Sequence, residues 1–388
     1  MSGSGDSSGE DRAEPETVRE EESTDGRSLT RRGILGLLGF GFLGGGGLVA
    51  DRMGGANDSW LPDSIEYARS NRVRWTSQIG KGVRLSPTVA DGTVYVPRGY
   101  AGSGVYALSA DDGIEQWVVQ NLSRVSSSPA VVGGTVYIGG TNGIVHALSA
   151  DDGTEQWTFE TGDWVDSSPA VVDGTVYVGS NDDTMYALSA DDASEQWSLE
   201  TDDSVASSPT VADGTVYVGN DEGIVYSLST DDGTVKWTFH TEAQVRSSPT
   251  VADGTVYVGS IDGNLYALSA DDGTEQWSLE TDELVASSPA VADGTVYLGG
   301  SDNTVYAMST IDGTVQWTVR TEGPVSSPAV VDGTVYVGTF EDTVYALAAD
   351  DGTEQWTFQT GGMVSPPTVV DGTVYVASTG GNLYALSP

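Results

Sequence analysis

Asp173-Gly-Thr-Val-Tyr-Val-Gly-Ser180 decides the fold of this chain, because its pattern recurs along most of the sequence. The Gly-Thr-Val-Tyr core begins at Gly92, Gly134, Gly174, Gly214, Gly254, Gly294, Gly333 and Gly372. A tryptophan keeps the same period, at Trp75, Trp117, Trp157, Trp197, Trp237, Trp277, Trp317 and Trp356. A fixed period of about 40 residues is typical of propellers and solenoids.

Each repeat contains four short runs rich in Val, Tyr, Phe, Trp and Thr, the residues that strands favour. In the third repeat we expect strands over 155–160, 167–172, 175–179 and 184–189. Asp173-Gly174 separates two of them and indicates a type I′ hairpin, in which both turn residues need a positive φ. Eight such repeats predict an all-β fold, an eight-bladed β-propeller of four-stranded antiparallel blades.

The ends of the repeat region indicate how the ring closes. The region begins with a tryptophan strand over 72–79 and ends with a strand over 383–387, so the last repeat lacks its outer strand. We expect the N-terminal Trp75 strand to pair with the last blade, which closes the ring and removes an exposed edge.

The run that ends at Trp117, Tyr-Ala-Leu-Ser-Ala-Asp-Asp-Gly-Ile-Glu-Gln-Trp, resembles the tryptophan-docking motif of pyrroloquinoline quinone (PQQ)-like repeat propellers. Gly113 and Trp117 match that motif, whereas Ser109, Asp112 and Ile114 replace its usual Asp, Thr and Lys. The resemblance covers residues 73–388. It implies that each repeated tryptophan docks on a neighbouring blade. The motif is shared by quinoprotein dehydrogenases and by non-enzymatic members such as BamB-type assembly proteins.

Composition excludes several classes of partner and site. The chain has 57 acidic and 16 basic residues, a net charge of −41, and no cysteine. Such a surface repels nucleic acid and anionic lipid, so we expect neither as a partner. At about 1 M salt the Debye length falls to about 3 Å, which suppresses self-repulsion and favours a high-salt environment. The lack of cysteine excludes disulfides and thiolate sites.

The region before the repeats divides into three segments. Residues 1–29 are acidic and lack apolar periodicity, which indicates disorder. Residues 30–50 carry Arg31-Arg32 before an uncharged apolar run, as in a twin-arginine export signal. Residues 51–72 form a linker. We therefore expect an extracytoplasmic protein, secreted or anchored by an uncleaved N-terminal segment, with membrane contact only through that segment.

Variable positions within the repeats mark the candidate binding site. The Asp-Gly and Asp-Asp-Gly turns repeat on one face of the ring, while the blade-to-blade crossings on the other face differ. The differing residues are Arg84, Arg124, Trp164, Asp166, Gln244, Arg246, Leu284 and Met363, and the middle hairpins add Tyr100, Ile261 and Phe340. The arginines suit a carboxylate or another anion, and Trp164 suits stacking. The alternative is ordinary loop variation, with the arginines paired to local acids.

No catalytic or metal site emerges from the sequence. The Asp-Asp pairs lack calcium-loop spacing and fit turns, and His146 and His240 are isolated. We expect a monomeric scaffold without cofactor that binds a protein, peptide or glycan. The alternatives are a quinoprotein dehydrogenase using PQQ and calcium, whose family usually needs an adjacent Cys-Cys pair and long insertions, and a membrane-anchored sensor domain.

Overall fold

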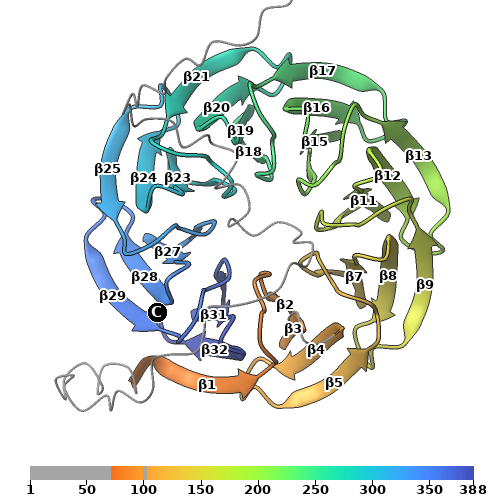
Figure 1. Cartoon of the computed structure of the whole chain (residues 1–388), viewed down its shortest axis with the longest axis horizontal. Coiled ribbons are helices and arrows are strands. Elements are labelled where there is room, and N and C mark those ends of the chain that lie inside the picture. The colour runs from red at the N-terminus through yellow and green to blue at the C-terminus, as the bar shows by residue number, and fades with distance from the viewer. Residues whose placement is uncertain (1–70, 99–102) are drawn as a thin grey trace, which may run out of the picture. The chain divides into compact units, whose positions relative to one another are not determined.

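A computed structural model describes residues 71–98 and 103–388 and shows an all-β ring of eight four-stranded antiparallel sheets (Figure 1). This confirms the predicted eight-bladed propeller. Three expected segments, 1–29, 30–50 and nearly all of 51–72, lie outside the described residues, as does Tyr100.

The strands of each blade are given from the innermost outward. Blade 1 is β2 (Thr88–Ala90), β3 (Thr93–Pro97), β4 (Gly104–Ser109) and β5 (Glu115–Gln120); blade 2 is β6 (Ala130–Val132), β7 (Thr135–Gly139), β8 (Ile144–Ser149) and β9 (Glu155–Glu160). Blade 3 is β10 (Ala170–Val172), β11 (Thr175–Gly179), β12 (Thr184–Ser189) and β13 (Glu195–Glu200); blade 4 is β14 (Thr210–Ala212), β15 (Thr215–Gly219), β16 (Ile224–Ser229) and β17 (Val235–His240). Blade 5 is β18 (Thr250–Ala252), β19 (Thr255–Gly259), β20 (Asn264–Ser269) and β21 (Glu275–Glu280); blade 6 is β22 (Ala290–Ala292), β23 (Thr295–Gly299), β24 (Thr304–Ser309) and β25 (Val315–Arg320). Blade 7 is β26 (Ala329–Val331), β27 (Thr334–Gly338), β28 (Thr343–Ala348) and β29 (Glu354–Gln359); blade 8 is β30 (Thr368–Val370), β31 (Thr373–Ala377), β32 (Asn382–Leu386) and β1 (Val73–Gln78).

Blade 8 combines the first strand with the last three. β1 pairs antiparallel with β32, with Trp75 opposite Ala385 and Ser77 opposite Leu383, and the two strands lie side by side in Figure 1. The inner strands β2 and β30 are also in contact. Thr368 Oγ1 donates to the carbonyl oxygen of Pro87 at 2.6 Å, which links blade 8 to blade 1.

The structure confirms the predicted turn type but corrects the predicted start of the inner strand. Asp173 and Gly174 both have a positive φ, at 50° and 78°, as a type I′ turn requires. The expected inner strand over 167–172 was too long, since β10 covers only Ala170–Val172. Pro169 has no N–H to donate, and the hydroxyl oxygen of Ser167 accepts from the amide of Gly179 at 2.8 Å. The serines therefore belong to the crossing that precedes the strand.

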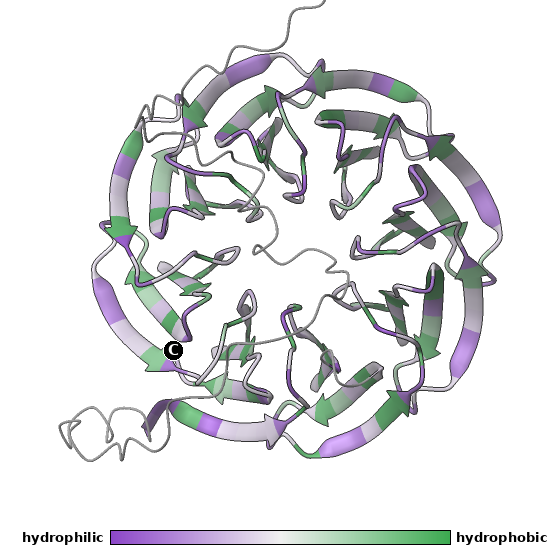
Figure 2. Ribbon diagram, viewed as in Figure 1, coloured by the Kyte–Doolittle hydropathy of each residue, from purple (hydrophilic) through white to green (hydrophobic). Residues whose placement is uncertain are grey.

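Apolar packing joins each blade to the next. One cluster contains Tyr137 and Val145 of blade 2 together with Val176, Val178 and Leu188 of blade 3. The outermost strands are the most exposed, and Figure 2 shows hydrophilic segments along them. Because each cluster draws on two sheets, no blade completes its core alone.

Tryptophan and tyrosine of one blade share a carbonyl of the next. Trp117 Nε1 and the hydroxyl of Tyr95, both in blade 1, donate to the Ala150 carbonyl oxygen of blade 2 at 2.9 and 3.3 Å. Their rings are tilted against each other at a centroid distance of 5.8 Å. A Cβ added to Gly153 would lie 2.8 Å from the Trp117 ring, so the turn glycine permits the indole to dock. The same tryptophan hydrogen bond occurs at Trp75, Trp157, Trp197, Trp237, Trp277 and Trp317.

Candidate binding face

The two faces of the ring are built from different loops. One face, which we call the turn face, carries the Asp-Gly turns between the first and second strands and the turns before the tryptophan strands. Ala190 N donates to Gly174 O and so joins two such turns. The other, which we call the loop face, carries the crossings between blades and the hairpins between second and third strands. There Asn181 N donates to Trp164 O at 2.8 Å. The sequence differences between blades therefore concentrate on the loop face.

A uniform backbone supports the variable side chains of the loop face. In blade 5 the amide of Ile261 donates to the carbonyl of Gln244 at 2.9 Å, and in blade 8 the amide of Thr379 donates to that of Met363 at 2.9 Å. The bonded residues differ in type, but the bond is the same. Backbone hydrogen bonds do not depend on side-chain type, so the sequence can change here without loss of the loop conformation.

Serine hydroxyls link the crossings round the axis of the ring. The amide of Ser128 donates to Ser168 Oγ of the next blade at 2.9 Å. Five equivalent bonds bring the total to six and join blades 1 to 7, through Ser86, Ser128, Ser168, Ser208, Ser248, Ser288 and Ser327. We call this series the serine ladder. Pro366 occupies the corresponding position of blade 8 and has neither an N–H nor a hydroxyl.

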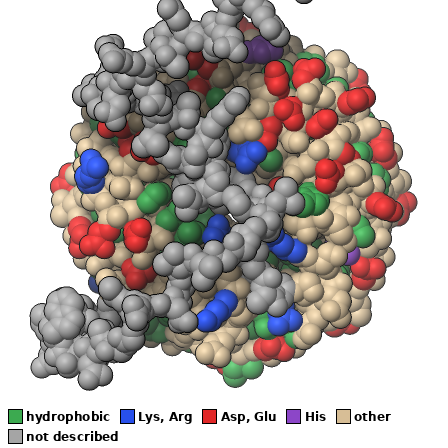
Figure 3. Space-filling view, viewed as in Figure 1, with side chains coloured by type: hydrophobic (Ala, Val, Ile, Leu, Met, Phe, Trp, Pro, Cys, Tyr) green, Lys and Arg blue, Asp and Glu red, His purple; other side chains and the backbone are tan. Residues whose placement is uncertain are grey.

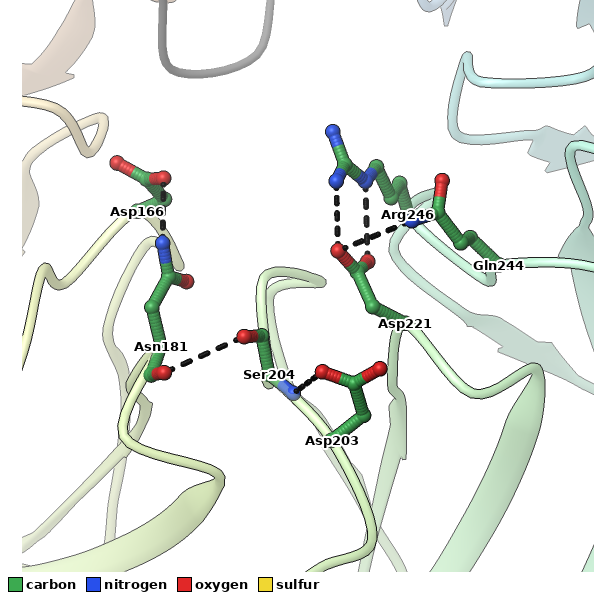
Figure 4. A network of polar contacts seen from close by, with 7 residues as sticks. All are labelled: Asp166, Asn181, Asp203, Ser204, Asp221, Gln244 and Arg246. Carbon is green, nitrogen blue, oxygen red and sulfur yellow. Dashed lines mark hydrogen bonds and ion pairs between the residues drawn. The ribbon is translucent and has the colours of Figure 1, made fainter. Parts of the chain in front are cut away.

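The structure places the eight predicted site residues in the crossings of the loop face, each partly exposed: Arg84, Arg124, Trp164, Asp166, Gln244, Arg246, Leu284 and Met363. Among the three predicted arginines, Arg246 forms an ion pair with Asp221 of blade 4. Its Nη2 and Nε atoms lie 2.6 and 3.0 Å from the two carboxylate oxygens (Figure 4).

Asp221 was missed at the level of sequence, although it occupies the same hairpin position as Ile261. Gln244 Nε2 also donates to it at 3.4 Å, so one carboxylate connects two predicted site residues. A bidentate guanidinium–carboxylate pair fixes both planes and is the strong form of this contact. The pair therefore orders the loops where blade 4 meets blade 5.

Asp166 is a partly buried carboxyl group of this face. Burial raises its pKa, while the amide of Asn181, which donates to Asp166 Oδ2 at 3.1 Å, and a hydrogen bond with Ser126 oppose that shift. The positive charges of Arg124 and Arg246 also lower this pKa, which places Asp166 within the field of both guanidinium groups. Figure 4 shows Asp166 and Arg246 on separate loops.

The remaining polar candidates have local structural contacts. His146 Nδ1 lies 3.0 Å from the Glu155 carboxylate of the adjoining strand, and Asp152 accepts from the amide of Thr154 within its turn. Across 71–98 and 103–388, no three His, Cys, Asp or Glu side chains are grouped to hold a metal ion. Within the same ranges, no helix has the length and apolar character to cross a bilayer.

Comparisons with known proteins define the class. A family described as the β-propeller of the beta-alanine-activating enzyme matches residues 86–332, more than half of the chain, and the chain belongs to this family. A second family, outer membrane protein assembly factor BamB, matches residues 320–388. The expected PQQ-like β-propeller is thus confirmed. A search of curated proteins gives no match.

Solved structures show the same fold at low identity. BamB from Moraxella catarrhalis is 20% identical, with a TM-score of 0.69 over 81% of this chain and 98% of that protein. The computationally designed Ika8 protein is 14% identical, with a TM-score of 0.75 over 82% and 100%. Quinohemoprotein alcohol dehydrogenase from Comamonas testosteroni is 15% identical, with a TM-score of 0.67 over 81% and 76%. An assembly factor and an oxidoreductase thus share this fold.

Proposed function

We propose that this chain is an exported, non-enzymatic binding propeller that recognises a protein, peptide or glycan through its loop face. The observation that carries the proposal is the contrast between the two faces. The turn face repeats the same Asp-Gly and Asp-Asp-Gly chemistry, whereas the loop face presents side chains that differ from blade to blade. In six blades the same backbone hydrogen bond joins the crossing to the hairpin beneath these side chains. The likeness to BamB supports a protein partner.

The apolar side chains of the loop face support contact with a macromolecule. Leu284, Pro324 and Met363 occupy equivalent crossing positions in blades 6, 7 and 8, and Ile261 and Phe340 occupy hairpins in blades 5 and 7. All five are partly exposed. Apolar groups next to charged ones form the mixed surface that protein interfaces use. Export rests on Arg31-Arg32, which lies outside the described residues.

Site-specific photo-crosslinking in the native host tests the choice of face. A photoreactive residue at Leu284 or Met363 should capture a discrete partner. The same residue at Ile114 or Ile311, which are 64% and 86% exposed on the turn face, should not. Equal capture from both faces, or capture from the turn face alone, would refute the proposal.

A separate measurement tests the enzymatic alternative. The proposal includes no catalytic residue and no PQQ site. We therefore expect no stoichiometric uptake of quinone when the purified protein is incubated with PQQ and calcium and its absorbance spectrum is recorded. A bound quinone together with dye-linked alcohol oxidation would establish a quinoprotein dehydrogenase instead.

A further inference from the structure

The crossing that leads into blade 2 departs from a pattern that six other crossings share. Each of those six begins with a threonine whose hydroxyl holds the loop in place: Thr161 Oγ1 donates to the carbonyl oxygens of Gly143 and Asp163 at 2.9 and 2.7 Å. The equivalent pair of bonds occurs at Thr201, Thr241, Thr281, Thr321 and Thr360. The crossing into blade 2 has Asn121 instead. Because threonine serves this position in six crossings, the fold itself does not require asparagine there.

Asn121 begins the tripeptide Asn121-Leu122-Ser123, which has the acceptor pattern for N-linked glycans. Within 71–98 and 103–388 no other asparagine is followed two residues later by Ser or Thr. The pattern is short, so its assignment depends on whether the folded chain presents the carboxamide and the hydroxyl to an enzyme.

The structure presents both groups of this tripeptide to solvent. Asn121 is exposed and Ser123 is partly exposed, in contrast to the buried Thr161. Among the described residues neither the carboxamide of Asn121 nor the hydroxyl of Ser123 takes part in a hydrogen bond, and only the backbone amide of Asn121 is bonded. Asn121 has a φ of 69°, a left-handed conformation in which asparagine is enriched. The nitrogen that would carry a sugar is therefore accessible in the folded ring.

The position and charge of this crossing also suit the reaction. Asn121 directly follows β5, the outermost strand of blade 1, so it lies at the outer edge of the ring. In Figure 3 acidic side chains lie mainly toward the edge of the visible face. The crossing 121–129 contains no Asp or Glu, whereas the crossing 161–169 contains Asp163 and Asp166. An anionic sugar-phosphate donor therefore meets less repulsion at Asn121 than at the next crossing.

We propose that Asn121 is a site of N-linked glycosylation. This inference goes beyond partner binding, but it relies on the export that forms part of the proposed function. A glycosyl phosphate donor of the host supplies the sugar. The bond between sugar C1 and the phosphate oxygen breaks, and the phosphate leaves with the electron pair. C1 then forms a bond with Asn121 Nδ2, which gives up one proton to the transferring enzyme.

The product carries a bulky hydrophilic chain at the edge of the loop face beside blade 2. Such a chain blocks close contact with a protein partner over this crossing. The crossings that contain Leu284 and Met363, in blades 6 and 8, remain accessible. The glycan therefore restricts where on the loop face a partner can bind.

Leu122, the middle residue of the tripeptide, anchors the crossing. It is 8% exposed and belongs to an apolar cluster with Trp117, Val125 and Ile138. Transfer to a folded chain requires this segment to open locally, and local opening costs free energy. We therefore expect modified and unmodified chains to be present together.

Mass spectrometry of the full chain purified from its native host tests this proposal. A fraction of the chains should exceed the mass of the polypeptide, with the added mass on the peptide that contains Asn121. Asn121→Asp removes the acceptor nitrogen but keeps a residue that tolerates a left-handed conformation, and Ser123→Ala removes the hydroxyl. Both variants should lose the added mass and still unfold cooperatively on heating. The matched control Asn142→Asp changes another exposed asparagine of the loop face, which has Ile144 two residues later, and should keep the added mass.

Three results would overturn the proposal: no added mass at Asn121 in any chain, added mass that persists in both variants, or added mass confined to Asn57, in the other Asn-x-Ser tripeptide of the sequence. Cell fractionation separates this inference from the proposed function. If the chain is exported but Asn121 is unmodified, only this inference fails. If the chain stays in the cytoplasm and Asn121 is unmodified, the proposed export fails as well.

Discussion

The guanidinium carbon of Arg72 lies 4.7 Å from the ring centroid of Trp356. Arg72 also donates from Nη1 to the carbonyl oxygen of Pro388 at 2.8 Å. Trp356 Nε1 is buried and has no hydrogen-bond acceptor among the described residues, unlike the other seven docking indoles. Arg72, which precedes β1, thus packs on Trp356 of blade 7 and binds the backbone that follows β32.

We expect Arg72→Ala to destabilise the fold by about 1–2 kcal/mol, because it loses a cation–π contact and a hydrogen bond. Urea unfolding followed by tryptophan fluorescence measures the change. Arg320→Ala on the outer strand β25 serves as a control for charge and should change stability by about 0.5 kcal/mol or less. Equal stability of the Arg72 variant and the native chain would contradict the closing role of this contact.

Trp117 and Tyr95 provide a test of the shared acceptor between blades. Trp117→Ala should cost about 3–5 kcal/mol, because it removes a large buried side chain from the junction. Trp117→Phe and Tyr95→Phe each leave Ala150 O with one donor, whereas the double variant leaves it with none. Thermal unfolding should therefore show a double-variant loss larger than the sum of the single losses. Strict additivity would show that the two bonds act independently.

Ala193 stands where the six equivalent turns have glycine: Gly113, Gly153, Gly233, Gly273, Gly313 and Gly352. Its φ is 61°, a left-handed conformation that costs a residue with a Cβ about 1 kcal/mol or more. Trp157, the tryptophan that docks on this turn, is more exposed than the other seven. We expect Ala193→Gly to raise the free energy of unfolding by about 1 kcal/mol. Gly153→Ala should lower it, and a stabilising effect there would contradict the explanation. Urea titration measures the free energy of unfolding of both variants.

The acidic surface leads to a prediction about salt. With a net charge of −41, repulsion between carboxylates destabilises the compact state at low ionic strength and is screened as salt rises. We expect the melting temperature to increase from about 0.1 M to about 2 M KCl. Differential scanning calorimetry measures the trend. A chain that is more stable in dilute buffer than in molar salt would exclude adaptation to high salt.

The raised pKa of Asp166 predicts how the free energy of unfolding depends on pH. Burial raises its pKa in the folded state, so above the unfolded pKa the folded state binds more protons at this site than the unfolded chain. Its contribution to stability is therefore largest in acid and is lost as pH rises through the folded pKa. Relative to Asp166→Asn, the native chain should become less stable between about pH 4 and pH 7. Urea titrations at both pH values test this, and the opposite trend would show that the arginine charges outweigh burial.

The architecture could be predicted from the sequence because every blade repeats the same motif. Asp173-Gly174 predicts its hairpin from local chemistry, and the eightfold period predicts the blade count. The inner strand was misjudged because the Ser-Ser-Pro run resembles strand residues, while its hydroxyls satisfy neighbouring backbone groups instead.

The side-chain contacts of the loop face could be predicted less well. Asp221 and Arg246 are 25 residues apart and belong to different blades, so their pairing depends on how two loops meet in space.

The absence of a ladder serine at Pro366 has a mechanical consequence for the ring. Between blades 7 and 8 the described residues provide neither a serine rung nor an acceptor for Trp356 Nε1. Every other junction has at least the tryptophan bond. The junction between blades 7 and 8 is therefore the weakest contact of the ring. Under heat or mechanical load the ring should open at this junction first, while the other seven junctions remain intact.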